Sequence, residues 1–431
     1  MQHCVFHYKN LAEVREEAEK LSAFLPLSQN SGPLFESLNI GGKTAENRFA
    51  FQPMEGTDGT EDGAPGELTF RRYQRFAEGG PGLIWFEAVA TVPEGRASAH
   101  QLMITKDNVD AFKRMTDMIR ETSMKRNGYA PVIVMQATNS GRYSKPKGYP
   151  EPIVAYHCPP LEEPMPENLR ILTDAELDSY TERFGEAARL SKEAGFDGMD
   201  VKCCHRYLAC ELLSAYERPG KYGGDFENRT RFLKDAYRAA SASVTGDFFL
   251  TSRMNAYDGF SGHNGFGNGA DGITPDMTEA IRLVKELKAE FNIPIINVTM
   301  GNPYKNPHVN RPYDIGNYVP EEHPFEGLSR MMKGVSEIQK ACPGVPVIGS
   351  AYSYLREFSW NLAAGMVESG FASMAGFGRE AFAYPDFIRD LRETGEMDPK
   401  KICVTCGGCA VLLRNGTPAG CVVRDREVYK R

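Results

Sequence analysis

The chain has 431 residues, of which 41% are hydrophobic and 25% are charged. These fractions are typical of a globular protein with a sizeable core and exclude a disordered or fibrous chain. The net charge of −7, with no basic stripe, argues against binding to nucleic acid or to an anionic membrane surface. No apolar run reaches the roughly 18 residues of a membrane helix, and the charged N-terminal stretch resembles neither a signal peptide nor an anchor. We therefore expect a soluble cytoplasmic protein.

Short runs rich in β-forming residues alternate with longer amphipathic stretches. The runs predicted as strands are Phe49–Pro53, Gly82–Glu87, Pro131–Gln136, Gly198–Lys202, Phe248–Met254, Ile293–Val298, Val345–Ser350 and Ala372–Phe377. Such alternation indicates a parallel sheet, for which a closed (β/α)8 TIM barrel is the expected architecture and an open doubly wound sheet the alternative. Active sites of these barrels lie at the C-terminal ends of the strands.

Two helix starts carry explicit signals. Thr173 and Glu176 form a capping-box pattern, and Thr274 followed by Pro275 predicts an N-cap with proline at the first helical position. We expect three regions along the chain: an N-terminal extension over residues 1–33 with a helix at Leu11–Phe24, the barrel over residues 34–395, and a cysteine-rich segment over residues 396–431. The extension is interpreted as a packing or dimerisation arm, and a homo-oligomer is expected.

Each of the last two predicted strands ends in a glycine-containing segment. These segments are Gly349-Ser350 and Gly376-Phe-Gly-Arg379. Loops after strands seven and eight of a barrel often bind phosphate through backbone N–H groups, and Arg379 adds a bidentate donor. The alternative is that the glycines only form tight turns. Because a Rossmann fingerprint is missing from the sequence, a mononucleotide in the barrel mouth is a better interpretation than a dinucleotide.

Four of the ten cysteines lie close together near the end of the chain: Cys403, Cys406, Cys409 and Cys421. Three closely spaced thiolates and one distant thiolate are a common way to hold a [4Fe–4S] cluster. A zinc site and an incidental grouping are the alternatives, although two zinc knuckles would need two separate Cys-x2-Cys pairs. The other cysteines show no ligand spacing and are interpreted as buried thiols.

Lys202, His205, Arg206 and Tyr207 follow the fourth predicted strand, which makes this strand end unusually polar. A tyrosine beside a cation is a good proton donor, because the cation stabilises the phenolate that remains. The alternative for some of these side chains is an ordinary solvated loop. His308, in the loop after the sixth strand, is expected either to point into the same mouth or to lie on the surface.

Several segments together resemble the Old Yellow Enzyme family of FMN-dependent ene-reductases. The resemblance covers residues 34 to 395 and rests on Asn47-Arg-Phe-Ala-Phe-Gln-Pro-Met54, Gly195-Phe-Asp-Gly198, Tyr207-Leu208 and Tyr222-Gly-Gly-Asp-Phe-Glu-Asn-Arg-Thr-Arg-Phe232. The terminal cysteines narrow it to the iron–sulfur branch, which includes 2,4-dienoyl-CoA reductase and trimethylamine dehydrogenase.

The resemblance implies a set of flavin-binding residues. Pro53, Met54 and Ala88 would line FMN through their backbone, Gln136 would bond its pyrimidine edge, and Arg253 would lie against its N1/O2 side. Ser350, Ala351, Gly378 and Arg379 would hold the phosphate, in agreement with the glycine loops.

The resemblance also implies the reaction. Hydride passes from flavin N5 to the β-carbon of an activated C=C bond, Tyr207 protonates the α-carbon with His308 or Lys202 assisting, and a donor near Lys202 and His205 polarises the activating carbonyl. The family's usual His-x-x-His or His-x-x-Asn pair is replaced by Lys202 and His205. Lys202 is therefore expected to polarise a carbonyl, to pair with Asp200 or to bind a substrate carboxylate. Enoyl thioesters, steroid enones, bilins and phenolic acids are all candidate substrates.

The electron source is left open by the sequence. The iron–sulfur relatives continue into FAD- and NAD(P)-binding domains, whereas this chain ends at Arg431. We expect the cluster to receive electrons from a separate reductase or ferredoxin, with direct reduction by NAD(P)H as a further possibility. The alternatives are an amine dehydrogenase with an aromatic bowl formed by Tyr257, Phe260 and Phe266, and an electron-transfer subunit of a larger complex.

Overall fold

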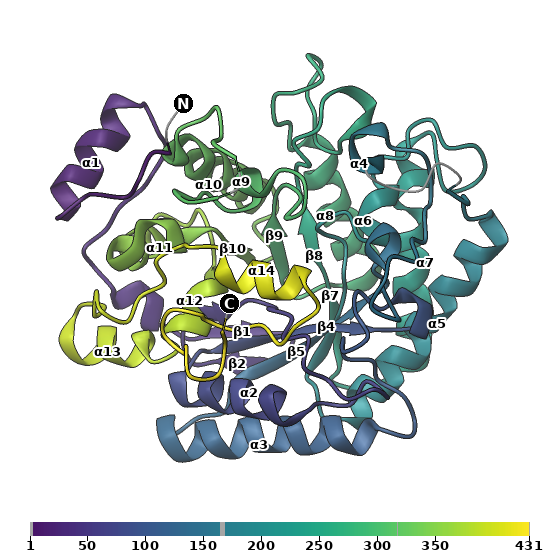
Figure 1. Cartoon of the computed structure of the whole chain (residues 1–431), viewed down its shortest axis with the longest axis horizontal. Coiled ribbons are helices and arrows are strands. Elements are labelled where there is room, and N and C mark those ends of the chain that lie inside the picture. The colour runs from purple at the N-terminus through teal and green to yellow at the C-terminus, as the bar shows by residue number, and fades with distance from the viewer. Residues whose placement is uncertain (1–2, 164–168, 317, 431) are drawn as a thin grey trace.

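The computed structural model describes residues 3–163, 169–316 and 318–430. Its main sheet is a ring of parallel strands in the order β7-β6-β5-β4-β3-β11-β10-β9-β8 (Figure 1). The strands are β3 (Phe49–Phe51), β4 (Leu83–Ala90), β5 (Val132–Thr138), β6 (Gly198–Val201), β7 (Phe249–Thr251), β8 (Arg253–Asn255), β9 (Ile296–Thr299), β10 (Val347–Gly349) and β11 (Met374–Phe377). Only Ser252 separates β7 from β8, so the two form one interrupted strand that closes the ring. The predicted TIM barrel is confirmed.

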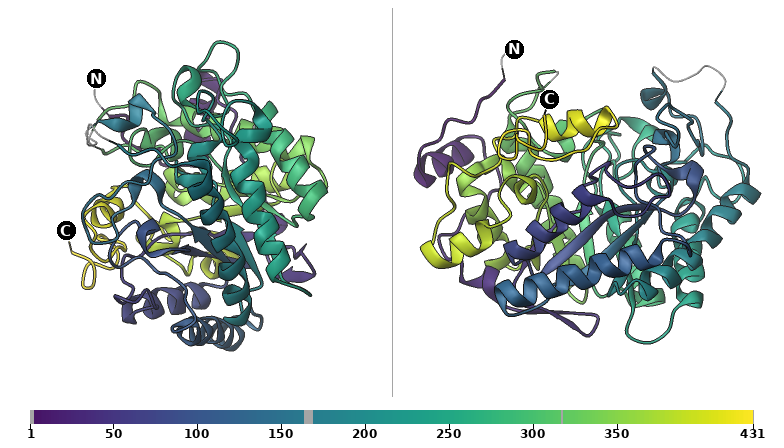
Figure 2. Two further views of the ribbon diagram at one scale, coloured as in Figure 1. Left: turned by 90° about the vertical axis from the view of Figure 1, so that its right-hand side faces the viewer. Right: turned by 60° about the horizontal axis from the view of Figure 1, so that its bottom comes forward.

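Helices surround the ring of strands (Figures 1 and 2). They are α1 (Leu11–Lys20), α2 (Glu67–Gly79), α3 (Val109–Asn127), α4 (Pro159–Glu162), α5 (Asp174–Glu193), α6 (Leu208–Leu212), α7 (Phe226–Ser243), α8 (Thr278–Phe291), α9 (Pro307–Asn310), α10 (Pro324–Ala341), α11 (Ser359–Glu368), α12 (Arg379–Ala383), α13 (Phe387–Thr394) and α14 (Gly408–Arg414). None of the described helices is both long enough and apolar enough to cross a membrane.

Side chains alternate between two apolar cores, as expected for strands buried on both faces. In β4, Leu83 and Trp85 belong to a small core inside the ring, whereas Ile84 and Phe86 belong to the large core beneath the helices. An antiparallel hairpin of β1 (Leu38–Ile40) and β2 (Lys43–Ala45) contributes Ile40 and Ala45 to the inner core. The inner core fills one part of the ring, so the site must lie toward the C-terminal strand ends.

The N-terminal extension packs against its own chain. Phe6 and Val14 are buried in the large core, the Phe6 N–H donates to Asp314 (2.9 Å), and the Phe24 N–H donates to the Ser329 hydroxyl (2.8 Å). The helix α1 ends at Lys20, earlier than the predicted Phe24. These contacts support the packing interpretation of the extension.

One of the two predicted helix starts is confirmed and the other is wrong. Thr173 caps α5, with its hydroxyl accepting from the Glu176 N–H while the Glu176 carboxylate accepts from the Thr173 N–H. In contrast, α8 begins only at Thr278. Asp271 accepts from the N–H groups of Ile273 and Thr274, so local turns form where the sequence predicts the cap.

The two threonines provide a matched test of helix capping. Thr173→Ala is expected to lower the free energy of unfolding by about 1 kcal/mol, because an orphan N–H at the start of α5 loses its acceptor. Thr274→Ala is expected to cost clearly less, because Thr274 caps no helix. Urea unfolding followed by circular dichroism measures both, and equal losses would contradict the assignment.

Candidate active site

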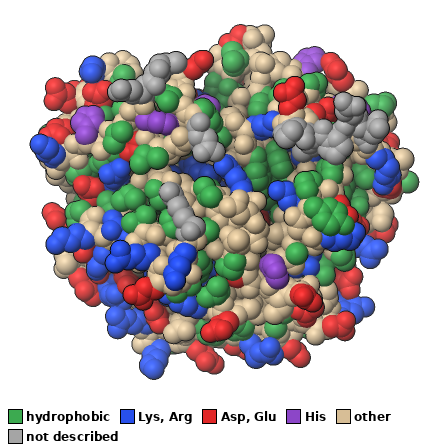
Figure 3. Space-filling view, in the orientation of Figure 1, with side chains coloured by type: hydrophobic (Ala, Val, Ile, Leu, Met, Phe, Trp, Pro, Cys, Tyr) green, Lys and Arg blue, Asp and Glu red, His purple; other side chains and the backbone are tan. Residues whose placement is uncertain are grey.

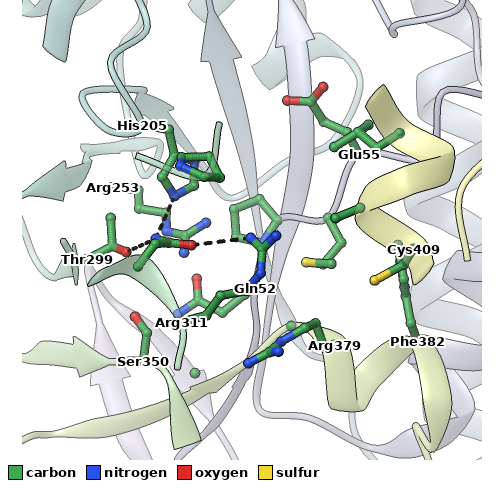
Figure 4. A pocket seen from close by; sticks show the side chains of 18 of the residues that line it. Gln52, Glu55, His205, Arg253, Thr299, Arg311, Ser350, Arg379, Phe382 and Cys409 are labelled. Carbon is green, nitrogen blue, oxygen red and sulfur yellow. Dashed lines mark hydrogen bonds between the residues drawn. The ribbon is translucent and has the colours of Figure 1, made fainter. Parts of the chain in front are cut away.

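A pocket opens at the C-terminal ends of the strands and gathers most of the predicted site residues. Those that line it are Pro53, Met54, Gln136, Lys202, His205, Tyr207, Arg253, Ser350, Ala351, Gly378 and Arg379. They come from six different strands or from the loops that follow them, and Figure 4 shows side chains from separate elements directed at one hollow. The pocket therefore lies in the region of the barrel where the sequence analysis expects the active site.

Two predicted residues are not among those that line the pocket. Ala88 is buried within β4, beside an irregularity of its pairing with β5. His308, on α9, contacts the Tyr318 hydroxyl through Nδ1 (2.5 Å) and lies 4.0 Å from Glu322. The aromatic residues proposed for an amine-binding bowl are also not among the lining residues, and Tyr257 donates instead to the Ile273 carbonyl (2.6 Å).

Other lining residues have no role predicted for them from the sequence. Among them are Glu55, Thr299, Tyr304, Asn310, Arg311 and Ser353, together with Ala410, Leu413 and Arg414 of α14. Glu55 and Thr299 closely follow predicted strands, so they lie where an active site of this barrel is expected. Tyr304 and α14 carry no such signal, because they reach the pocket only through the fold.

The turn after β6 holds two consecutive non-glycine residues in the left-handed region, His205 (φ 62°) and Arg206 (φ 61°). Such conformations cost roughly 1–3 kcal/mol each and persist only where the surroundings hold them. Arg206 is fully buried and donates to Asp258 (2.8 Å) and to the Tyr156 hydroxyl (2.7 Å). This buried anchor turns Arg206 away from the pocket and leaves Lys202, His205 and Tyr207 lining it.

Lys202, Tyr207 and Glu55 form a compact group. The Lys202 ammonium lies 3.2 Å from Glu55 Oε1 and 3.7 Å from the centre of the Tyr207 ring. The Tyr207 hydroxyl donates to the same carboxylate oxygen (3.3 Å) and lies 3.1 Å from the Tyr304 hydroxyl. The expectation that Lys202 pairs with Asp200 is corrected, because Asp200 accepts instead from Gln136 (2.6 Å), Trp85 (2.7 Å) and the Arg253 backbone.

Burial and charge shift the acidity of the lining groups. Burial, and then the Glu55 carboxylate, raise the pKa of Tyr207 well above its usual value, so the phenol holds its proton. Burial, followed by the nearby cations Arg253 and Lys202, lowers the pKa of His205 well below its usual value. Burial and the neighbouring Arg379 lower the pKa of Arg311 to about 10.

Cations outnumber carboxylates in the pocket. Glu55 is the one carboxylate among its described lining residues, against five cationic side chains: Lys202, Arg253, Arg311, Arg379 and Arg414. Figure 3 shows Lys and Arg side chains inside the hollow near the centre of this face. Arg253 is buried, its Nε has no hydrogen-bond partner, and it forms no ion pair within the described part of the chain. A buried unpaired guanidinium is costly unless an anion occupies the pocket.

The two predicted phosphate-binding loops lie on the same pocket. Ser350, Ala351 and Ser353 follow β10, and Gly376, Gly378 and Arg379 lie at the end of β11. A Cβ atom added to Gly378 would approach the Met54 sulfur to 2.9 Å, so any larger residue at this position would collide with Met54. Ala351 adopts a left-handed conformation (φ 76°) that turns the chain at this point. This cradle and the orphaned Arg253 fit an anionic mononucleotide.

The four clustered cysteines surround a small cavity beside the pocket. Cys403, Cys406, Cys409 and Cys421 all line it, and Arg379, Phe382 and Cys409 line both this cavity and the main pocket. Figure 4 shows Cys409 and Phe382 side by side near Arg379. Within residues 3–163, 169–316 and 318–430, no group of three His, Cys, Asp or Glu side chains is placed to hold a single metal ion. The thiols nevertheless form the donor set that an iron–sulfur cluster uses.

Comparison with known families identifies the chain. The model of the NADH:flavin oxidoreductase / NADH oxidase family matches residues 33–397. The chain belongs to this family. The predicted resemblance is thereby confirmed. The family description names a flavin, which the sequence analysis expects as the cofactor, and NADH, which it gives as one possible electron donor. An NADH oxidase of Thermoanaerobacter brockii is 27% identical over 386 residues, which are 87% of this chain and 53% of the relative, so the chain spans about half of that enzyme.

Solved structures share the fold at low sequence identity. A 2-naphthoyl-CoA reductase in complex with 2-naphthoyl-CoA has a TM-score of 0.73 and 20% identity, covering 92% of this chain and 57% of that chain. An old yellow enzyme homologue from Zymomonas mobilis has a TM-score of 0.62 and 22% identity, covering 85% of this chain and 94% of that chain. At these identities the likenesses show that this chain shares the fold of these proteins.

The depressed pKa of His205 predicts a pH dependence of stability. Burial favours the neutral imidazole in the folded protein. The contribution of His205 to the free energy of unfolding is therefore complete above its unfolded pKa of about 6.5, and it is lost as the pH falls below this value. The free energy of unfolding should decrease by up to about 1.4 kcal/mol per pH unit from this group. His205→Asn should lose the part of this decrease that comes from the His205 imidazole. His263→Asn, at an exposed position, should decrease in stability as the wild type does. Urea titrations from pH 7.5 to 5 measure both; identical slopes in all three proteins would refute the assignment.

Proposed function

We propose that the chain is an FMN-dependent ene-reductase that reduces an activated C=C bond. The observation that carries this proposal is the buried Tyr207 hydroxyl, held beside the Lys202 ammonium in a cationic pocket with an orphaned arginine. When bound, FMN supplies the hydride for the β-carbon of the alkene. Pro53, Met54, Gln136 and Arg253 are the groups proposed to hold its ring. Ser350, Ala351, Gly378 and Arg379 are proposed to hold its phosphate.

Tyr207 is the proposed proton donor to the α-carbon. Its raised pKa keeps the phenol protonated, and the ammonium 3.7 Å from the ring centre stabilises the phenolate that forms when the proton leaves. His205 lies at the same wall with a ring nitrogen 3.4 Å from the Asn310 amide. As a neutral imidazole, it can donate one hydrogen bond to the activating carbonyl of the substrate. His308 contacts Tyr318 rather than the pocket, so its proposed assistance would require a rearrangement of α9.

The four cysteines are proposed to hold a [4Fe–4S] cluster. Their cavity shares Cys409, Phe382 and Arg379 with the flavin pocket, which supports electron transfer between the two sites. Such a cluster would supply single electrons. A separate reductase or ferredoxin, or NAD(P)H acting on the flavin, is proposed as the source.

An anaerobic substrate screen tests the function. The protein is produced with ample flavin and iron, reduced with dithionite, and mixed with 2-cyclohexenone, cinnamate, crotonyl-CoA or a steroid enone while the flavin absorbance is followed. Reoxidation by an alkene supports the proposal. Reduction of the oxidised protein by amines, without reoxidation by any alkene, would support the amine dehydrogenase alternative, which the Lys202 ammonium in the pocket disfavours. If no alkene reoxidises the reduced flavin and no amine reduces the oxidised flavin, both proposals are overturned.

Tyr207→Phe separates the two half-reactions. Loss of a general acid is expected to slow alkene-dependent reoxidation by roughly 10²–10⁴-fold, because the carbanion loses its proton donor. Flavin reduction should keep its wild-type rate, since this half-reaction needs no proton from Tyr207. Stopped-flow absorbance measures both rates, with Tyr149→Phe as an exposed control. Equal slowing of both half-reactions would contradict the role of Tyr207.

Cysteine variants test the cluster. Wild-type protein purified without oxygen is expected to contain about four iron and four sulfide per chain. Cys421→Ala should lower both values and bleach the broad visible absorption of the cluster. Cys342→Ala, at a buried thiol that contacts the Ile281 carbonyl instead, should retain the wild-type content. Zinc in place of iron in the wild-type protein would support the alternative of a zinc site at these cysteines.

A further inference from the structure

A second cavity adjoins the active-site pocket at Glu55. It has a volume of about 540 Å³, and its walls include residues 97–100, Tyr143 and Lys145. Glu55, Tyr304, Leu413 and Arg414 line both this outer cavity and the pocket. The Glu55 carboxylate therefore lies between a space large enough for many waters and the hydroxyl of Tyr207.

The two carboxylate oxygens of Glu55 differ in their partners. Oε1 accepts from Lys202 Nζ (3.2 Å) and from the Tyr207 hydroxyl (3.3 Å). Oε2 accepts no hydrogen bond from any described residue, and the side chain retains 12% of its exposure. Oε1 therefore contacts the proposed proton donor, while Oε2 is available to accept a hydrogen bond from water.

The neighbouring backbone holds Glu55 in this position. The Gly56 N–H donates to Glu87 on β4 (2.8 Å), and the Gly56 carbonyl accepts from the Ala419 N–H (2.7 Å). Any side chain at residue 56 would collide with the guanidinium of Arg72, which pairs with Glu87 (2.5 Å) and Asp58. Elements from three parts of the chain therefore fix this loop, as a preorganised site requires.

We propose that Glu55 relays a proton from water in the outer cavity to Tyr207 between turnovers. The inference rests on the proposed role of Tyr207 as proton donor. Protonation of the substrate breaks the Tyr207 O–H bond and leaves a phenolate. Glu55 then takes a proton from hydronium in the outer cavity, which becomes water, and passes it from its carboxyl group to the phenolate oxygen. Both side chains return to their starting states, and no electrons move in these steps.

The groups around the pair act on the proton in opposite directions. Lys202 stabilises the transient phenolate, while burial and the Glu55 charge raise the pKa of Tyr207 and so draw the proton back. Any pH profile of the relay also reflects the other titratable and charged groups that face this pair. These are His100 after β4, Tyr143 and Lys145 after β5, Cys204 and His205 after β6, Arg253 of β8, Tyr304 and Arg311 after β9, and Arg414 of α14.

Single-turnover and steady-state rates test the relay. Dithionite-reduced methyl viologen supplies electrons and 2-cyclohexenone is the alkene. In Glu55→Gln, the first reoxidation of the flavin should remain within about 3-fold of wild type, because Tyr207 still begins protonated. Steady-state turnover should fall at least about 10-fold and should fall further as the pH rises, since solvent must then reprotonate Tyr207 directly. The exposed Glu61→Gln, on the same loop, should match wild type in both rates.

Chemical rescue separates proton transfer from positioning. Glu55→Ala leaves a space that opens on the outer cavity, so added acetate should restore its steady-state rate in proportion to concentration. Glu55→Gln should gain nothing from acetate, because the amide still fills the space. If both rates fall together in Glu55→Gln and acetate restores neither variant, Glu55 only positions Tyr207 and the relay is overturned. Wild-type steady-state turnover in Glu55→Gln would overturn it equally.

A measurement without turnover distinguishes failure of the relay from failure of the proposed function. The tyrosine ring-carbon resonance that disappears in Tyr207→Phe reports the surroundings of the Tyr207 hydroxyl in protein labelled with ¹³C-tyrosine. At neutral pH, Glu55→Gln should shift this resonance, because the charged hydrogen-bond acceptor 3.3 Å from the hydroxyl becomes a neutral amide. An unchanged resonance would overturn the contact on which the relay depends. If Glu55→Gln shifts the resonance but the wild-type protein reduces no alkene, only the ene-reductase proposal is overturned.

Discussion

The buried guanidinium of Arg253 is the constraint on which the pocket depends. Two other buried cations near it have acidic partners in the protein: Lys202 pairs with Glu55 (3.2 Å), and Arg206 pairs with Asp258 (2.8 Å). Arg253 pairs with none of the described carboxylates, and its Nε has no acceptor. Retaining such a group costs stability unless a bound anion compensates it. FMN carries an anionic phosphate, and its binding here would satisfy this requirement. Such an anion would account for a cationic barrel mouth in a protein of net charge −7.

The strained turn after β6 follows from the same need for fixed geometry. A relaxed loop could not keep the Lys202 ammonium against the Tyr207 ring while directing Arg206 in the opposite direction. The buried pairing of Arg206 with Asp258 holds the left-handed backbone at His205 and Arg206. A buried ion pair thus holds the strained backbone in place. The result is a Tyr207 hydroxyl with little freedom to move, as its proposed role as proton donor requires.

The sequence predicts the scaffold better than the interior of the site. Strand periodicity is local, so all of the predicted strands could be located, although Ser252 divides the fifth into β7 and β8. The Thr274-Pro275 signal failed because Asp271 and Asp276 form local turns that delay α8. Tyr304 could not be predicted as a partner of Tyr207, nor Arg311 as a neighbour of Arg379, since only the closure of the ring brings the segment after β9 to these side chains. The resemblance placed His308 near the substrate, whereas its contact with Tyr318 depends on the local path of α9.

The C-terminal segment forms part of the wall of the candidate active-site pocket. In Figures 1 and 2 the segment lies over the barrel, and the residues of α14 show what it covers. Leu413 and Arg414 line both cavities, Cys409 lines both the pocket and the cysteine cavity, and the Ala419 N–H holds the loop that carries Glu55. A group bound by the four cysteines would therefore order the wall of the pocket and the position of Glu55 together. The proposed electron transfer and the proposed proton relay would then both depend on the C-terminal segment, because its residues line the cysteine cavity and the outer cavity as well as the pocket.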